Sequence, residues 1–213
     1  MRLKKLPRSF YLRPTITVAR DLLGKYLVRA IGRKKLVGRI VEVEAYCEGD
    51  PASHSFRGMT ERNKVMFGEG GHLYVYFTYG MHFCANVGTR EEGIGEAVLI
   101  RAVEPIAGTE VMAKNRSKGM VPTGASPYSA LHTPHLTNGP AKVCQAFGIA
   151  RKHNGVDLCS NAIWIAASTL KPETSNSKLS ISSSPRIGIR TGRERKWWFY
   201  VKGSSWASKP NRV

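Results

Sequence analysis

The sequence has little cysteine and no long apolar segment. Its four cysteines, Cys47, Cys84, Cys144 and Cys159, are scattered. They form no Cys-x-x-Cys pair and no Cys/His cluster at metal-ligand spacing, which argues against structural zinc and favours a reduced, intracellular protein. No run of about eighteen apolar residues occurs, and no apolar segment follows the basic start MRLKKLPRSF, so we expect neither a membrane span nor secretion.

Acidic residues are also scarce. Only 15 Asp and Glu stand against 33 Lys and Arg, which gives a formal net charge of +18. The first forty residues carry twelve of these cations and one acid, Asp21, whereas eleven of the fifteen acids lie between Glu42 and Glu110. Such a surplus is typical of proteins that bind a polyanion, with nucleic acid as the first candidate. Charge alone also fits RNA, the ribosome, an anionic lipid surface, or a solvated surface without a partner.

The length of 213 residues fits a single domain. A composition that is 42% hydrophobic suffices for a substantial core without metals or crosslinks. No internal repeat divides the chain. The Ser-rich stretch near 168–185 predicts a flexible surface insert rather than a domain boundary. We therefore expect one domain over residues 1–213.

The secondary structure expected around the most informative residues is alternating strands and short capped helices. Residues 36–46 (LVGRIVEVEAY) predict a strand with Glu42, Glu44 and Tyr46 on one face. Two further strands, 73–78 and 81–87, meet at Tyr79-Gly80, which predicts a hairpin with a tyrosine at its tip. Elsewhere we expect helices at 14–23, 106–116 and 140–147 and strands at 25–30, 97–103, 186–189 and 197–202.

Glu44 is the strongest candidate for chemistry. A carboxylate on an otherwise apolar strand is costly to bury unless it is paired or used, although a salt bridge on a solvated strand face would also explain it. Arg101 is the only charge in the apolar run 97–103, and an arginine there requires an anion. If Arg101 holds Glu44 ionised, the carboxylate can orient and deprotonate a water molecule.

Four other residues are candidates for binding a base. Tyr76 and Tyr79 lie in an aromatic run, where packing into the core is the default and is the interpretation we prefer for the neighbouring Tyr74 and Phe77. A tyrosine at a hairpin tip on a basic protein can instead act as a wedge that replaces an extruded base. His54, otherwise a surface or structural histidine, could stack and hydrogen-bond. Asn86, by default a polar residue on a strand edge, could read a base substituent.

Blocks of sequence along nearly the whole chain resemble one enzyme family, the alkyladenine (3-methyladenine) DNA glycosylases. The family implies a single mixed α/β (α+β) domain around a curved antiparallel β-sheet, with a protruding β-hairpin and flanking helices, that acts as a monomer without metal or cofactor. The blocks are RIVEVEAY (39–46), DPASHS (50–55), ERNKVMF (61–67), LYVYFTYGMHFCANV (73–87), AVLIRAVEP (97–105), NGPAKVCQAFGI (138–149), RIGI (186–189) and FYVKGSSWAS (199–208).

The resemblance also implies an activity. Members excise alkylated or otherwise damaged purines from duplex DNA in base-excision repair, so the expected substrates are 3-methyladenine and 7-methylguanine, with hypoxanthine and ethenoadenine as further candidates. Carried over by motif, Glu44 is the general base and Arg101 helps to hold the attacking water. Tyr46, His54 and Tyr76 correspond to the walls that stack on the flipped base. The expected location is an intracellular site with access to DNA, in the cytoplasm or nucleoid of a bacterium or the nucleus of a eukaryote.

The remaining roles concern the DNA itself. Tyr79 matches the residue that fills the gap left in the duplex, and Asn86 matches the side chain that disfavours normal guanine. Thr60 and Arg62 lie in the block whose members touch the DNA backbone. The sequence departs from the family at His82, where an aromatic residue such as tyrosine is familiar.

Three other functions compete with this interpretation. A zinc nucleobase deaminase also flips bases, but it needs an H-x-E motif with a downstream P-C-x-x-C, and neither occurs here. A glycosylase with an additional lyase step would need an amine nucleophile, for which Lys142 is available. A non-catalytic binder of damaged or structured nucleic acid could use the same charge and wedge, but it would have no need to keep Glu44 and Arg101 together.

Overall fold

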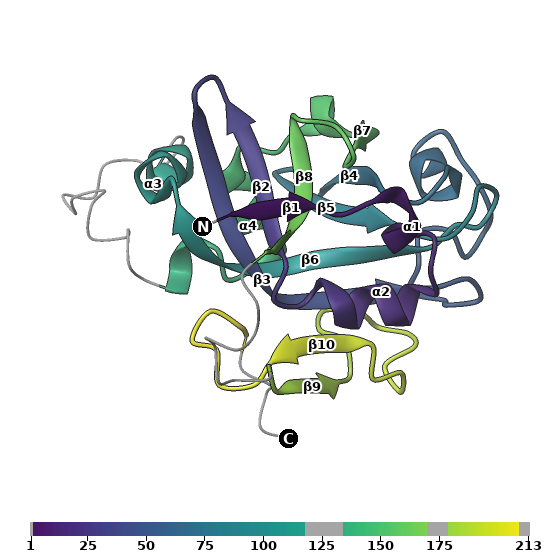
Figure 1. Cartoon of the computed structure of the whole chain (residues 1–213). Coiled ribbons are helices and arrows are strands. Elements are labelled where there is room, and N and C mark those ends of the chain that lie inside the picture. Colours follow the sequence, from purple (N-terminus) through teal and green to yellow (C-terminus); the bar gives the residue numbers. More distant parts are fainter. Residues whose placement is uncertain (1, 118–133, 170–178, 209–213) are drawn as a thin grey trace.

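One antiparallel sheet runs through the part of the chain that the computed structural model describes, residues 2–117, 134–169 and 179–208 (Figure 1). The strand order is β1-β8-β2-β3-β6-β5-β4-β7, and β9 and β10 extend it beside β3. The strands are β1 (Leu3–Lys5), β2 (Tyr26–Ile31), β3 (Lys34–Tyr46), β4 (His72–Thr78), β5 (His82–Gly88), β6 (Ala97–Ala107), β7 (Val156–Asp157), β8 (Ile163–Ser168), β9 (Ile181–Ser184) and β10 (Trp198–Val201).

Strand β3 is the central and longest strand. Its first half pairs with β2 and its second half with β10, while β6 pairs along its other edge. The register with β6 shifts between Ile40 and Glu42, so Val41 forms a β-bulge. Ile40 and Val41 are both fully buried in the main core. Beyond the bulge, Glu42 and Glu44 face the side opposite the core, as the alternation in the sequence predicts.

Short helices cover the core. Helix α2 (Thr15–Leu22) buries Val18, Ala19 and Leu22, and α4 (Pro140–Phe147) begins with proline and ends at Gly148 in the left-handed conformation, with φ of 64°. The bounds of α4 are those the sequence predicts. Helix α3 begins later than expected because β6 continues to Ala107. The other helices are α1 (Arg8–Tyr11), α3 (Thr109–Ser117) and the 3-10 turns η1 (Lys64–Phe67), η3 (Pro134–Leu136) and η4 (Arg151–His153).

Strands β4 and β5 form the predicted hairpin, and its tip is unusual. Tyr79 and Gly80 both have positive φ, 51° and 65°, as a type I′ turn requires. A tyrosine in this conformation strains the backbone, which asparagine or glycine would avoid. The strain indicates a functional role for the tyrosine side chain. Tyr79 is 82% exposed and Met81 67%. Phe77, which we expected in the core, is 38% exposed, because its packing partner Phe83 lies on the same projecting hairpin.

The C-terminal part of the chain differs from the sequence prediction in two places. Residues 186–189 were expected as a strand, but they form a loop, because Ile187 donates its N–H to a side chain and Gly188 turns the backbone with φ of 75°. In the Ser-rich stretch, Ile181–Ser184 form β9, which pairs with β10. Residues 170–178 of that stretch lie outside the described residues, as do residues 118–133.

The described elements confirm the expected class, a mixed α/β (α+β) fold around a curved antiparallel sheet (Figure 1). Among the helices of the described ranges, none is long and apolar enough to cross a membrane.

Candidate active site

A row of directly opposed residues crosses four strands and forms the floor of a pocket. Glu44 of β3 lies opposite Leu99 of β6, which lies opposite Asn86 of β5, which lies opposite Tyr74 of β4. The cavity above this row has a volume of about 340 Å³. Its lining comprises Glu44, Tyr46, Ala52, His54, Met66, Tyr74, Tyr76, Thr78, Tyr79, Cys84, Asn86, Leu99, Arg101, Pro140, Ile187, Gly188 and Ile189.

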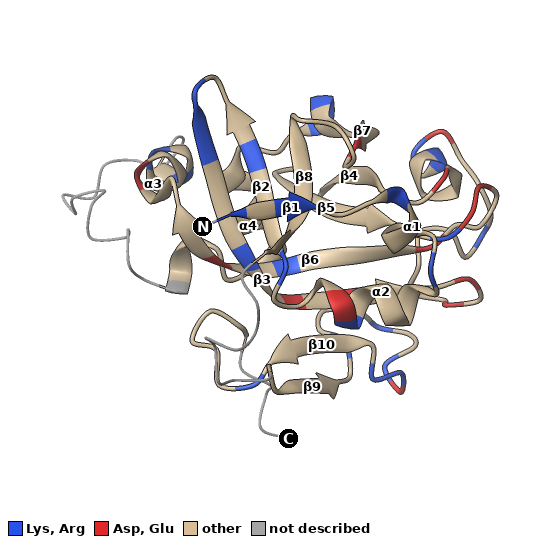
Figure 2. Ribbon diagram, in the orientation of Figure 1, with Lys and Arg blue, Asp and Glu red and all other residues tan. Residues whose placement is uncertain are grey.

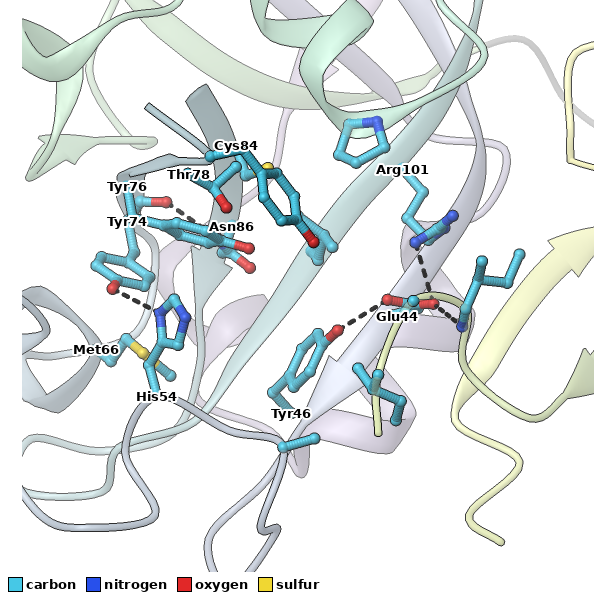
Figure 3. A pocket seen from close by; sticks show the side chains of 17 residues that line it. Glu44, Tyr46, His54, Met66, Tyr74, Tyr76, Thr78, Cys84, Asn86 and Arg101 are labelled. Atoms are coloured by element: carbon cyan, nitrogen blue, oxygen red, sulfur yellow. Dashed lines mark hydrogen bonds and ion pairs between the residues drawn. The ribbon is translucent and has the colours of Figure 1, made fainter. Parts of the chain in front are cut away.

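Glu44 is fully buried at one side of this pocket, and three groups hold its carboxylate. The Ile187 N–H donates to Oε1 at 2.8 Å, and Nη1 of Arg101 lies 3.2 Å from the same oxygen. The Tyr46 hydroxyl donates to Oε2 at 2.8 Å. Hydrogen-bond donors and a cation therefore surround both oxygens of the carboxylate. The expected contact between Glu44 and Arg101 is therefore present (Figure 3).

Arg101 has a second and shorter contact that the sequence did not identify. Its Nε donates to Oε1 of Glu42 at 2.7 Å, and Glu42 also accepts from Trp198 Nε1 at 3.0 Å and from the Ser208 N–H at 2.6 Å. Burial lowers the pKa of Arg101, but the carboxylates of Glu44 and Glu42 outweigh burial and raise that pKa overall. The arginine is thus fixed as a cation between two carboxylates, which orients it in the pocket.

Aromatic side chains form the opposite side of the pocket, facing Glu44 (Figure 3). The rings of His54 and Tyr76 meet edge to face, with centroids 4.5 Å apart, and Nδ1 of His54 is 2.9 Å from the Tyr74 hydroxyl. Burial, and then Arg62, lowers the pKa of His54, so its imidazole is neutral at pH 7. Burial raises the pKa of Tyr74 to about 12 and that of Tyr76 further, so both phenols stay protonated.

Tyr46 connects the aromatic residues to the carboxylate. Burial raises the pKa of Tyr46, and the neighbouring Glu44 raises it further, so its hydroxyl remains a donor to Glu44. Its ring lies 4.9 Å from the guanidinium of Arg186. The predicted residues Glu44, Tyr46, His54 and Tyr76 are thus brought together around one cavity.

Asn86 and Cys84 reach the pocket from β5. Asn86 is almost completely buried, and its Nδ2 donates to the Tyr74 carbonyl at 3.2 Å. Cys84 lies opposite Tyr76 in the hairpin register, and burial raises the pKa of its thiol. The sequence identified Asn86 but not Cys84 or Tyr74, because a cysteine or a tyrosine on an apolar strand is also typical of an ordinary packed core, whereas a buried amide is not.

Thr60 and Arg62 lie on an exposed loop at the rim rather than in the pocket. Asn63 fixes this loop: its Oδ1 accepts the Thr60 N–H at 2.6 Å, and its Nδ2 donates to the His54 carbonyl at 2.8 Å. The guanidinium of Arg62 lies 5.9 Å from the Tyr76 ring centroid. A positive rim is therefore held next to the aromatic side.

A buried ion pair, which sequence analysis missed, anchors the loop that supplies Ile187. Arg186 and Asp50 are both fully buried and bond through two guanidinium nitrogens, and Arg186 Nη1 also donates to the Ala45 carbonyl at 3.1 Å. The guanidinium also lies 5.3 Å from the ring of Trp197. This pair holds the backbone N–H of Ile187 against Glu44.

Other chemistries have less support from the positions of the side chains. Lys142 does not line the cavity, and its Nζ donates to Asn138 Oδ1 at 2.8 Å. In the described ranges, no three His, Cys, Asp or Glu side chains gather in a way that could hold a metal ion.

Comparison with known proteins gives one consistent result. A family model described as "Methylpurine-DNA glycosylase (MPG)" matches residues 9–205. A protein of Methanoculleus marisnigri is 44% identical over 206 residues, which cover 96% of this chain and 98% of the relative. A protein of Desulfitobacterium hafniense is 45% identical over 215 residues, which cover 97% and 99%. Both are named "Putative 3-methyladenine DNA glycosylase". The matched residues include every side chain that lines the pocket.

Proposed function

Because the chain belongs to the methylpurine-DNA glycosylase family and is thus a DNA glycosylase of base-excision repair, we propose that it flips an alkylated purine out of duplex DNA into this pocket. It then hydrolyses the N-glycosidic bond without a lyase step and acts as a monomer. The observation that carries the proposal is the buried carboxylate of Glu44 facing an aromatic wall across a cavity of about 340 Å³. Such a cavity suits a flat, cationic base beside an anion.

Glu44 has one position left for the attacking water. A carboxylate has about four lone-pair sites, and Ile187, Arg101 and Tyr46 occupy three of them. The free site is on Oε2. A water that donates there loses its proton to Glu44 as its oxygen attacks C1′ of the sugar. The C1′–N bond breaks, and its electron pair leaves with the purine.

The charge pattern around the reacting atoms favours this step. Cleavage passes through an oxocarbenium-like sugar, which the nearby carboxylate stabilises. A base alkylated at N3 or N7 is cationic, so it leaves as a neutral molecule and is attracted to aromatic faces before it leaves. Tyr46, His54 and Tyr76 would supply those faces. A neutral His54 adds no positive charge that would repel such a base.

Selectivity is shared between the lesion and the pocket. A damaged base pairs poorly and is less costly to extrude. The buried Asn86 amide in the pocket floor would disfavour the exocyclic amino group of normal guanine. We propose 3-methyladenine, which lacks that amino group, and 7-methylguanine, which keeps it but leaves more easily because its ring is cationic, as the main substrates, and hypoxanthine and ethenoadenine as further ones. Thr60 and Arg62 at the rim would contact the DNA backbone.

Release of a free base from duplex DNA tests the proposed function. A duplex with a single 3-methyladenine analogue or hypoxanthine is incubated with the protein, and free base and abasic sites are counted. We expect base release with no strand cleavage and no adduct after borohydride treatment. The undamaged duplex is the control. Tight binding without release would favour a non-catalytic binder, and a trapped adduct would indicate an amine nucleophile.

Tyr79→Ser should weaken capture of the flipped base. The exposed ring fills the gap in the duplex, and stacking of an aromatic ring on a base contributes about 1–3 kcal/mol, so affinity for lesion duplex should fall by roughly 5- to 150-fold. The measurement is the Kd for matched lesion and undamaged duplexes. Met81→Ser, which changes the neighbouring exposed residue, is the control. An equal loss on both duplexes, or no loss on either, would count against the wedge.

A further inference from the structure

The basic first forty residues contribute none of the side chains that line the pocket. Part of their charge is neutralised locally, since Arg8, Arg13 and Arg39 pair with carboxylates. Residues 33–35, at the turn between β2 and β3, are exposed and form no ion pair with any residue in the described ranges. The strongest charge asymmetry of the sequence therefore has no role in the proposed reaction.

Four neighbouring strands concentrate this charge. Strands β1, β8, β2 and the part of β3 before Glu42 contain no Asp or Glu, nor does the turn between β2 and β3. Figure 2 shows Lys and Arg on β1, β2 and the first part of β3, and β8 between β1 and β2 has no charged residue. A region without acids cannot neutralise its own cations. The cations are Lys4, Lys5, Arg29, Arg33, Lys34, Lys35 and Arg39, of which only Arg39 pairs with a carboxylate of the described ranges, that of Glu104 on β6.

The register places aromatic and cationic side chains on the face of these strands that points away from the main core. Lys5 lies opposite Ala166, which lies opposite Tyr26, and Val28 lies opposite Trp164. Tyr26 and Trp164 cover a small buried cluster that is separate from the main core. We call Lys5, Tyr26, Lys35 and Trp164 the outer basic face. Lysines gathered on one face without acidic neighbours are typical of surfaces that contact the phosphates of nucleic acid.

Two ammonium groups converge on one ring of this face. Nζ of Lys5 is 5.6 Å and Nζ of Lys35 is 5.8 Å from the Trp164 ring centroid. Lys5 is held there, because it also donates to the Cys159 carbonyl at 3.0 Å and to Asn161 Oδ1 at 2.8 Å. The ring stabilises each cation but removes no net charge, so both ammonium groups remain available to pair with backbone phosphates.

We propose that the outer basic face is a second contact surface for duplex DNA, which binds backbone phosphates independently of the pocket. The inference rests on the proposed function only in taking DNA as the polyanion. Phosphate contacts carry no sequence information, so this surface binds damaged and undamaged DNA alike. Its effect is to keep the enzyme on DNA between lesions.

Two adjacent lysines of β3 provide a matched test. Lys35 lies on the outer basic face. Lys34 is two residues before Leu36, so its side chain lies on the opposite face of the strand, the one from which Leu36 points into the main core. Lys35→Gln and Lys34→Gln change the net charge equally. Binding to an undamaged duplex of about 30 base pairs, roughly three helical turns, is measured from about 50 to 200 mM salt.

We expect Lys35→Gln alone to reduce the salt dependence. Each phosphate contact adds about 0.9 to the slope of log K against log salt, so over this range wild type should lose roughly threefold more affinity than the variant. Lys34→Gln should match wild type. Equal behaviour of all three proteins, or an equal change in both variants, would overturn the proposal.

The same proteins are assayed for base release at saturating enzyme, where both variants should keep the wild-type rate because neither residue lines the pocket. A wild-type protein that releases no base would contradict the proposed function, yet the affinity comparison on undamaged duplex would still decide the role of the outer basic face. The two hypotheses therefore fail separately.

Discussion

Glu44→Gln is expected to reduce the single-turnover rate of base release by about 10²- to 10⁴-fold, the usual contribution of a general base. Glutamine has the shape of glutamate and can still accept the Ile187 N–H, but it cannot take a proton from water and cannot stabilise a cationic sugar. Affinity for lesion duplex should change little. The measurement combines single-turnover kinetics with a direct determination of Kd.

Glu104→Gln is the matched control, because Glu104 is a half-buried carboxylate that binds Arg39 at 2.7 Å outside the pocket. It should retain the wild-type rate. A Glu44→Gln variant with full activity would mean that another group activates the water. If the wild-type protein bound lesion duplex without releasing base, and Glu44→Gln bound it equally well, only the hypothesis of a non-catalytic binder would remain.

Asp50→Asn should cause the largest loss of stability. The substitution leaves the guanidinium of Arg186 buried without its anion, and breaking a buried ion pair in this way costs about 3–5 kcal/mol. For a domain of this size the midpoint of thermal unfolding, Tm, should fall by roughly 6–20 °C. Below that temperature base release should also slow, because the loop that presents the Ile187 N–H to Glu44 loses its anchor.

Arg195→Gln serves as the control for Asp50→Asn. Its guanidinium stacks on the ring of Trp197, 4.6 Å from the centroid, but it lies nearer the surface than Arg186. Its ion partner Glu194 is exposed, and ion pairs at the surface contribute little, so Tm should change by only a degree or two. If Asp50→Asn were as stable as Arg195→Gln, the buried pair would not be what holds the loop.

Local patterns predicted the elements that carry much of the site. The hairpin β4–β5 and helix α4 follow from turn and cap residues close in sequence, and both were predicted with nearly their observed bounds. The alternation of β3 predicted that Glu42 and Glu44 share a face. The contact between Glu44 and Arg101 could be inferred because a lone arginine in an apolar strand requires an anion.

The groups that the sequence did not reveal act over long separations in the chain. Glu42, and not Glu44, makes the shorter contact with Arg101. Which of the two carboxylates lies nearer depends on the register between β3 and β6, which the sequence does not show. Asp50 and Arg186 are 136 residues apart, and neither has an apolar surrounding in sequence that would mark it as buried. The Ile187 contribution is a backbone N–H, which no side-chain pattern can indicate.

The bulge at Val41 separates two halves of β3 with different uses. The half before it carries Lys35 of the outer basic face, and the half after it carries Glu44 of the pocket. Side chains alternate with a period of two residues, so losing one residue between Lys35 and Ile40 would invert every position between the deletion and the turn that precedes β3. Lys35 would then point into the interior and Leu36 into solvent, while Glu44 would stay in place. The number of residues in this strand is therefore constrained as well as their identity. An insertion or deletion of an odd number of residues would turn core side chains toward solvent and surface side chains toward the core.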